Sequence, residues 1–351
     1  MDRAKTTVID VVEASYDLQA GAAEWLPQML DAGGGTFDLG LGAGAALTAG
    51  WSPEGHPLMA QMIPGTAGPD LLTGLMRTAH EVGADMVQQT SKAWIGGGTI
   101  TILSDDRERW PKLYEAMTRN VGCKDILSLF AMDPDYHGAN ILMPSPEVIQ
   151  LSSKSRAQLQ MLAIHITAGY RLRRNLTDPQ KVPGVAPTEI PLSAEALLDP
   201  KGFLVAHAVG AAKAHEASKT IREAAVRVDR ARGKLRKNDP QEALELWHGL
   251  VRGRWSLVDW FDTDGRRFVL ATSNAPNIRD PRGLTEREAQ VATYAAIGES
   301  SKIVGYRFGI SPQRVSMLLT SAMRKLSVKT PAQLVEKMRG LPASTDFKTE
   351  T

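Results

Sequence analysis

The sequence predicts an α+β protein that ends in a small, entirely helical domain. Over residues 1–275, strand candidates bounded by Gly, Pro and Asp turns alternate with amphipathic helical stretches. Residues 281–340 carry only helix start and stop signals. A proline-rich stretch at 177–193 divides the α+β region into two bodies. We therefore expect two α+β domains, one helical domain and a tail at 341–351.

The composition excludes several classes of protein. The chain has 351 residues, 43% of them hydrophobic and 23% charged, as globular proteins do. Cys123 is the only cysteine, which excludes an internal disulfide and a multi-cysteine metal site. The sequence has no apolar run long enough to span a membrane, and its acidic N-terminal stretch does not fit a signal peptide. We expect a cytoplasmic protein with no membrane partner.

The first body, residues 1–176, has a layout of helix, strands and exit helix. A helical stretch from Val8 to Leu30 opens it, and an amphipathic helix at 152–174 closes it. Between them lie the strand candidates FDLGLGAGAAL, GTITIL, ILSLFAMD and GANILM, the last two forming a hairpin across a polar turn. This layout resembles a GAF-type sensor domain.

A sensor of this layout implies a small-molecule pocket on the sheet face that the helices leave free. The candidate lining residues are the large apolar side chains of Trp51, Trp94, Phe130 and Met132. Each of them taken singly also fits ordinary core packing. The ligand that such a pocket would hold is unknown from the sequence.

The second body, residues 194–275, follows the linker at 177–193, where a proline recurs at every fourth position. Two hairpins are expected around the Asp-x-x-Gly turns at 199–202 and 262–265. Between them we expect a charged helix at about 211–237 and a shorter helix that holds Leu244 to Val251. The layout resembles an abbreviated PAS-type module. We interpret the nine basic and three acidic side chains of 213–237 as a solvated or dimer-facing surface.

The C-terminal domain, residues 281–340, is marked out by helix caps. Thr285 and Glu288 form a capping box, and Ser300 caps a second, short helix. Gly309 provides a tight turn, and Ser311 followed by Pro312 starts a third helix. Thr330-Pro331 repeats that pair at the start of a fourth. Four short helices with a glycine turn between the second and third match the helix-turn-helix plan.

The charge of this domain and the faces of its third helix point to DNA. The segment from 281 to 340 carries a net charge of +6, whereas the rest of the chain carries −4. One face of the third helix is an apolar stripe formed by Val315, Leu318, Leu319, Ala322, Met323 and Leu326. The opposite face holds Gln313, Ser316, Met317, Thr320 and Arg324. We expect this outer face to enter the major groove.

Residues spread over all four helices carry a family resemblance. They are Leu284-Thr285, Arg287-Glu288, Val291, Gly298, Ser301-Lys302, Val304, Ile310-Ser311, Val315, Leu319, Lys325-Leu326 and Val328. In order and spacing they resemble the LuxR-type DNA-binding domain. The resemblance implies a domain that binds double-stranded DNA as a homodimer, with the third helix in the major groove and the fourth helping to pair the protomers. The expected DNA contacts are Lys302, Gln313, Arg314, Ser316, Met317, Thr320, Arg324 and Lys325.

Three positions depart from the family pattern. The family usually has glutamate where Ile303 stands, lysine at Ser316 and often histidine at Leu318. Leu318 extends the apolar stripe, so we expect it to pack. Ser316 removes a cation from the DNA face, which should weaken phosphate contact.

The sequence predicts a transcription regulator controlled by a ligand or partner at its N-terminal domains. The alternative is a protein–protein interaction module whose helix-turn-helix has lost DNA recognition. An enzyme is the third class, but no catalytic constellation, metal-ligand cluster or cofactor motif appears in the sequence, so we expect no enzyme activity, metal or cofactor.

Overall fold

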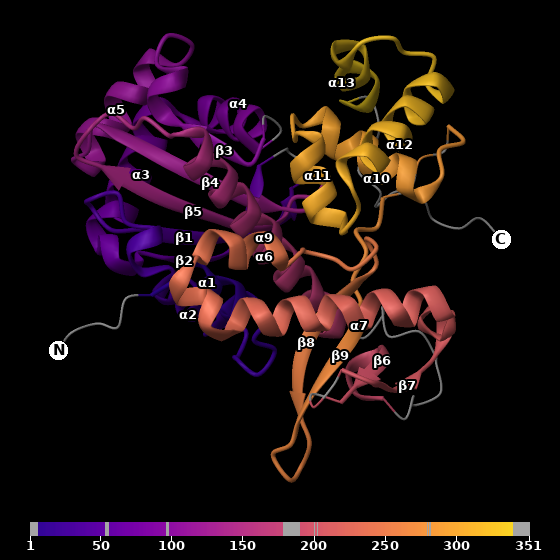
Figure 1. Cartoon of the computed structure of the whole chain (residues 1–351). Helices are drawn as coiled ribbons and strands as arrows, with labels where there is room; N and C mark the ends of the chain where they lie inside the picture. Colours follow the sequence, from indigo (N-terminus) through magenta and orange to yellow (C-terminus); the bar gives the residue numbers. More distant parts are fainter. Residues whose placement is uncertain are drawn as a thin grey trace.

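The chain forms two antiparallel β-sheets with their helices and a helical domain at the C-terminal end (Figure 1). This computed structural model describes residues 6–52, 56–95, 98–177, 190–199, 201, 203–278, 280 and 282–339. The greater part of the predicted proline linker, residues 178–189, and the predicted tail lie outside the described residues. Within the described residues, no helix is both long and apolar enough to cross a membrane.

The first sheet has five strands in the order β2-β1-β5-β4-β3. Their bounds are β1 (Gly44–Trp51), β2 (Pro57–Ile63), β3 (Ile100–Ile102), β4 (Asp125–Met132) and β5 (His137–Ser145). The predicted hairpin is confirmed, because β4 pairs with β5 from Asp125–Ser145 to Met132–Gly138. The strand predicted at 37–47 is correct only in its second half. The glycines at 40 and 42 have left-handed φ values, so the extended strand begins at Gly44.

Within the described residues, six α-helices accompany this sheet. They are α1 (Val8–Ser15), α2 (Trp25–Gly33), α3 (Pro69–Val82), α4 (Ala84–Ile95), α5 (Pro111–Val121) and α6 (Ser153–Thr177). The predicted long closing helix is confirmed as α6. The single helical stretch predicted from Val8 to Leu30 is wrong, because α1 ends at Ser15, whose carbonyl accepts a hydrogen bond from the Trp25 indole.

The second sheet has the order β7-β6-β9-β8. Its strands are β6 (Ala194–Leu198), β7 (Val205–Ala208), β8 (Trp255–Phe261) and β9 (Arg267–Ser273), so both predicted hairpins are confirmed. In the β8–β9 turn, an Asp262 carboxylate oxygen accepts the backbone N–H groups of Asp264 and Arg266, and Gly265 is left-handed.

The helices of the second body differ from the prediction. The charged helix is α7 (His215–Arg230), which leads into a π turn (Ala231–Leu235) and the short α8 (Arg236–Asn238). Gly233 adopts a non-helical backbone there, which breaks the helix. The helix predicted to hold Leu244 to Val251 is α9 (Pro240–Leu246), so Trp247, Leu250 and Val251 are buried in the loop that follows it.

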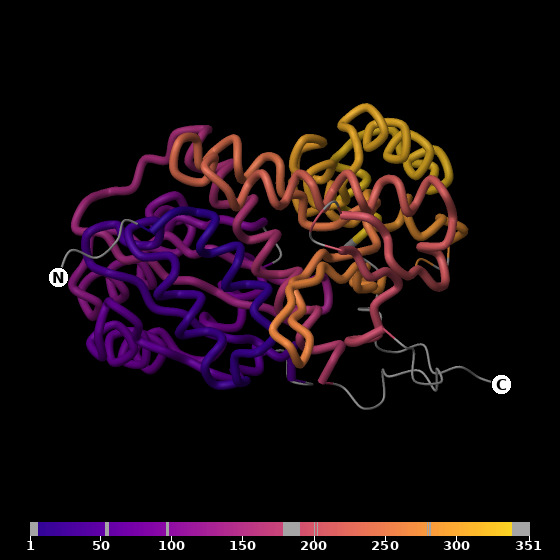
Figure 2. The backbone as a smooth tube through the Cα atoms, turned by 60° about the horizontal axis from the view of Figure 1, so that its bottom comes forward, coloured from indigo at the N-terminus to yellow at the C-terminus, as the bar shows by residue number. Residues whose placement is uncertain are grey.

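One hydrophobic core runs through both bodies. Helices α1, α2 and α6 cover one face of the first sheet and contribute to the same cluster as Leu257 and Leu270 of the second sheet. Ile303 and Tyr306 from the C-terminal domain also belong to it. Figures 1 and 2 show α7 passing alongside the C-terminal helices toward the first body. The described domains therefore pack together.

A buried polar joint fastens the two sheets to α6. The Arg171 guanidinium pairs with Asp133, at the end of β4, and donates to the Asn274 carbonyl after β9. The Asn274 amide in turn donates to the Ala168 carbonyl and to the Ser256 hydroxyl, each at 2.8 Å. Each side chain of this joint satisfies polar groups of another element, which is how buried charges are accommodated.

Candidate nucleic-acid interface

The C-terminal domain forms the four predicted helices, and the predicted caps are confirmed. They are α10 (Glu286–Ala296), α11 (Ser301–Phe308), α12 (Pro312–Lys325) and α13 (Pro331–Arg339). At the start of α10, the Glu288 backbone N–H donates to the Thr285 hydroxyl, and the Glu288 carboxylate accepts from the Thr285 backbone N–H. Ser300 and Ser311 cap α11 and α12 through their hydroxyl groups.

The turn between α11 and α12 requires two glycines. Gly309 ends α11 with a left-handed φ of +61°. At Gly305, the Ile310 carbonyl lies 2.7 Å from where a Cβ would stand. The turn can therefore be tight, and α12 starts only three residues beyond Gly309.

Helix α12 has the two predicted faces. Val315 and Ala322 are buried, while Leu318 and Leu319 pack against the core of the domain, so the packing role predicted for Leu318 is confirmed. The outer face is exposed to solvent, with Met317 62% exposed. The other exposed side chains of this face are Gln313, Arg314, Ser316, Thr320 and Arg324. All six were predicted as DNA contacts.

The two predicted lysine contacts each lie beside a carboxylate. The Lys325 ammonium lies 2.6 Å from the buried Glu288 carboxylate. Hydrogen bonds from Lys325, Ser321 and the Thr285 backbone lower the pKa of Glu288 to about 2, so this carboxylate is ionised at neutral pH. Lys302 lies 3.4 Å from Glu245 of α9.

Two exposed cations remain on α12. Arg314 lies in its first turn and Arg324 in its last, and in the described part of the chain neither has an acidic partner. Both are therefore available to bind an anion.

The helical domain is docked on the body through α11. The Tyr306 hydroxyl lies 2.6 Å from Nε2 of the buried His165 on α6, and it donates to the Leu244 carbonyl. Nδ1 of His165 lies 3.2 Å from the Tyr16 hydroxyl of α1. Burial lowers the pKa of His165 to about 3, so its imidazole is neutral. This contact was not predicted from the sequence, where its signal is a tyrosine on the apolar face of a short helix.

Further contacts join the domain to the turn before β8. The Arg287 guanidinium donates to the carbonyls of Gly253 and Arg252 at 2.8 and 2.6 Å. The Gly249 backbone N–H donates to the Tyr306 carbonyl of α11 at 3.3 Å, and a Cβ on Gly309 would stand 2.2 Å from the Leu250 carbonyl. These contacts involve α10, α11 and the turn at Gly309, so the outer face of α12 stays exposed in the docked domain.

The four predicted pocket residues lie apart from the described cavities. The Trp51 ring packs edge-on against Tyr136, with centroids 5.3 Å apart, and the Trp94 indole donates to Asp106 at 2.7 Å. Phe130 is buried, and Met132 is half-buried. Their role as a ligand pocket stays a prediction.

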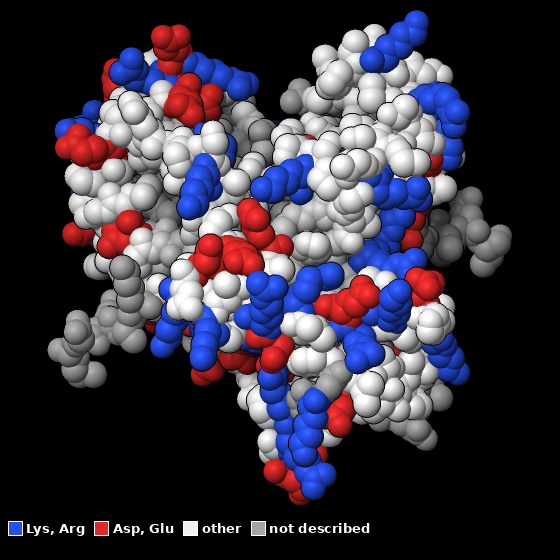
Figure 3. All heavy atoms as spheres, viewed as in Figure 1, with Lys and Arg blue, Asp and Glu red and all other residues white. Residues whose placement is uncertain are grey.

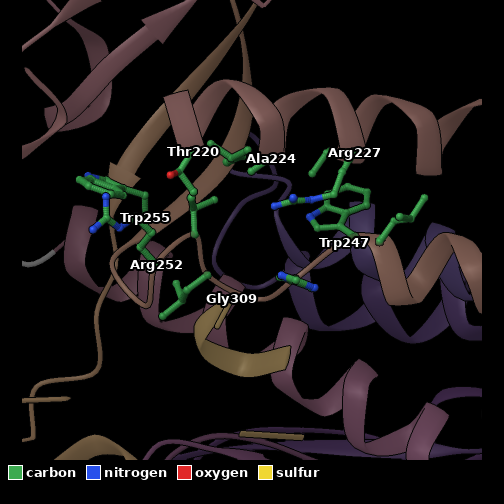
Figure 4. Close-up of a pocket in the computed structure, with 13 residues that line it drawn as sticks. Thr220, Ala224, Arg227, Trp247, Arg252, Trp255 and Gly309 are labelled. Carbon is green, nitrogen blue, oxygen red and sulfur yellow. The ribbon is translucent and has the colours of Figure 1, made fainter. Parts of the chain in front are cut away.

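Two hollows lie near the second body. An enclosed cavity of about 20 Å³ between α7 and Gly309 has room for a single water molecule (Figure 4). An open hollow of about 550 Å³ lies at the π turn, where Arg232 and Arg236 are already paired with acidic side chains. Neither includes the predicted pocket residues.

Comparison with protein families identifies the C-terminal domain. Residues 282–338 match the family of bacterial regulatory proteins described as the luxR family. Neither the curated proteins nor the solved structures contain a match to the chain. The predicted LuxR-type helix-turn-helix is confirmed for this segment, and it supports a DNA-binding transcription regulator. The GAF-like and PAS-like interpretations of the two bodies stay predictions.

Proposed function

We propose that this protein is a transcription regulator that binds double-stranded DNA as a homodimer, with α12 in the major groove. The observation that carries the proposal is the exposed outer face of α12 in a docked domain that matches the luxR family. An α-helix fits the width of the major groove, where hydrogen bonds to base edges provide sequence recognition.

The exposed residues of α12 divide into two roles. Arg314 and Arg324 contact phosphates, because they are the unpaired cations of the described helix. Gln313, Met317 and Thr320 face the bases, where an amide, an apolar side chain and a hydroxyl each discriminate between base pairs. Lys325 stabilises the domain through Glu288, and Lys302 stays beside α9.

The test compares two neighbouring cations on the full chain. DNA duplexes are selected from a random library, and affinity is then measured between about 50 and 200 mM salt by fluorescence anisotropy. Arg324→Gln should weaken binding to every DNA sequence. It should also reduce the salt slope, which is the slope of the logarithm of the binding constant against the logarithm of the salt concentration, by about 0.9. Lys325→Gln should lower the melting temperature and leave the slope near that of the unsubstituted protein. If the folded chain shows no salt-dependent DNA binding, the alternative of an interaction module is correct.

Dimerisation is proposed to use α13. Its described residues Ala332, Gln333, Glu336 and Lys337 are exposed in the single chain. The edge strand β2 is a competing surface, because it lacks charged residues and Met59 on it is 46% exposed. In analytical ultracentrifugation, Ala332→Arg should reduce the dimer fraction, whereas Met59→Lys should not. The reverse result would place the dimer contact at β2.

Control by a small ligand in the first body is part of the same proposal. Its support is the layout of an antiparallel sheet covered by helices, together with the large apolar side chains of Trp51 on β1, Trp94 on α4 and Phe130 on β4. Thermal-shift screening of the full chain against a metabolite library tests it. A ligand that raises the melting temperature of the unsubstituted protein but not of Trp94→Ala would support the predicted pocket. If no compound stabilises the protein, the first body is a scaffold.

A further inference from the structure

An arginine in an unusual backbone conformation lies next to the helix-turn-helix. Arg252, in the turn that precedes β8, has a left-handed φ of +49° and an exposed side chain. Residues with a Cβ adopt this conformation at a cost in free energy, which glycine avoids and asparagine partly avoids. Strained residues of this kind concentrate at functional sites. The position would be more stable with glycine, so its arginine points to a use for the side chain.

The surroundings of Arg252 are electropositive. Arg254 and Arg287 lie close enough that the positive charges of Arg252 and Arg254 lower the pKa of Arg287, in addition to the larger effect of burial. Glu195 pairs with Arg254, and Glu286 offsets part of the charge at Arg287. Among the described residues, Arg252 has no acidic partner of its own. Arg254 and Arg287 are thus engaged within the chain, and Arg252 is the guanidinium of this group whose charge is left for an anion from outside the chain.

The turn that holds Arg252 supports the start of α12. A Cβ on Gly309 would stand 2.2 Å from the Leu250 carbonyl and 3.3 Å from the Arg252 backbone nitrogen. Figure 4 shows Arg252 and Gly309 on the side of the small cavity opposite Thr220 and Ala224 of α7. In Figure 3, Lys and Arg side chains gather where the C-terminal helices meet the second body. The turn that holds Arg252 and the turn that leads into α12 therefore lie against each other.

We propose that Arg252 is a DNA-backbone contact supplied from outside the helix-turn-helix domain. The inference rests on the proposed function, since it needs DNA seated against α12. A helix in the major groove brings the phosphates on both sides of the groove near its N-terminal end. On α12 only Arg314 lies at that end among the unpaired cations, and Ser316 provides a hydroxyl but no charge. Arg252 would add a further cation from the turn that packs against Gly309, three residues before α12 begins.

The left-handed backbone of Arg252 allows a test that separates binding from folding. Arg252→Gly removes the charge and relieves the backbone strain, so its melting temperature should equal or exceed that of the unsubstituted protein. Loss of one phosphate contact should reduce the salt slope by about 0.9, which corresponds to a roughly fivefold weaker affinity at about 0.15 M salt. The order of preference among DNA sequences should stay the same, because phosphate contacts carry no sequence information.

Three further variants of the full chain make the result decisive. Arg252→Asn is a second uncharged variant that tolerates the left-handed conformation, and Arg252→Lys should keep the slope. Arg266→Ala removes an exposed arginine from the β8–β9 turn and should change neither slope nor affinity. If both uncharged variants bind as the unsubstituted protein does, this inference is wrong and the proposed function stands. If the unsubstituted protein binds no DNA, both are wrong.

Discussion

Mild acid should destabilise the fold through His165. This imidazole is fully buried between Tyr16 and Tyr306, and burial lowers its pKa to about 3. An unfolded histidine has a pKa of about 6.5. The contribution of His165 to the free energy of unfolding is therefore complete above about pH 6.5. It decreases as the pH falls toward 3, because the unfolded chain takes up a proton that the folded chain does not.

The size of the effect follows from the two pKa values. Between about pH 7.5 and 5 the unfolded histidine becomes almost fully protonated while folded His165 stays neutral. Linkage then gives a loss of about 2 kcal/mol in the free energy of unfolding. The half-buried His248, whose pKa burial lowers to about 4, acts in the same direction. The raised pKa of buried Asp133 acts in the opposite direction, so the effect of His165 has to be isolated by a variant.

The measurement is urea unfolding followed by tryptophan fluorescence at the two pH values. His165→Gln should be less stable than the unsubstituted protein at about pH 7.5, because it disturbs the contacts to Tyr16 and Tyr306. Its loss of stability on going to about pH 5 should be smaller by about 2 kcal/mol. His207→Gln, at an exposed histidine of β7, should follow the unsubstituted protein. Equal losses for the His165→Gln variant and the unsubstituted protein would refute a neutral, buried His165.

Three further substitutions test the packing of the helical domain and the joint. Gly309→Ala should lower the free energy of unfolding by more than about 1 kcal/mol, because residue 309 has a left-handed φ and its new Cβ would meet the Leu250 carbonyl. An unchanged melting temperature in calorimetry would contradict this. Ser311→Ala removes the cap of α12 and should lower the free energy of unfolding, measured in urea, by about 1 kcal/mol. An unchanged free energy of unfolding would mean that the cap is dispensable. Arg171→Met leaves Asp133 buried without its partner and should cost about 3–5 kcal/mol, so a loss below 1 kcal/mol would show that the pair is solvated.

The parts of the fold that the sequence predicts correctly depend on local signals. The box formed by Thr285 and Glu288 lies within three residues, and the β8–β9 turn is determined by Asp262 and Gly265. Such short-range chemistry can be recognised without the rest of the chain. This local character explains why helices α10–α13 and the hairpins lie at the positions predicted from the sequence.

Long-range packing accounts for what the sequence analysis missed. His165 and Tyr306 are 141 positions apart, and no local pattern connects them. Trp247 belongs to the apolar run that predicted a helix, yet it is buried in a loop, because periodicity does not distinguish the two over a short stretch. The predicted DNA contact Lys325 likewise pairs with Glu288 across 37 positions, which no local pattern indicates.

The docked arrangement gives the first body a direct route to the proposed DNA face. Helix α11 contacts α6 through Tyr306 and His165, while α12 leaves its outer face exposed, so docking and DNA binding use different surfaces of the domain. Since α11 and α12 are joined by the tight turn at Gly309 and share one core, they move together. Under the proposed function, a shift of α6 caused by a bound ligand would therefore displace α12 together with α11. In a dimer, that displacement would change the distance between the two recognition helices, and this distance has to match the spacing of the two DNA half-sites.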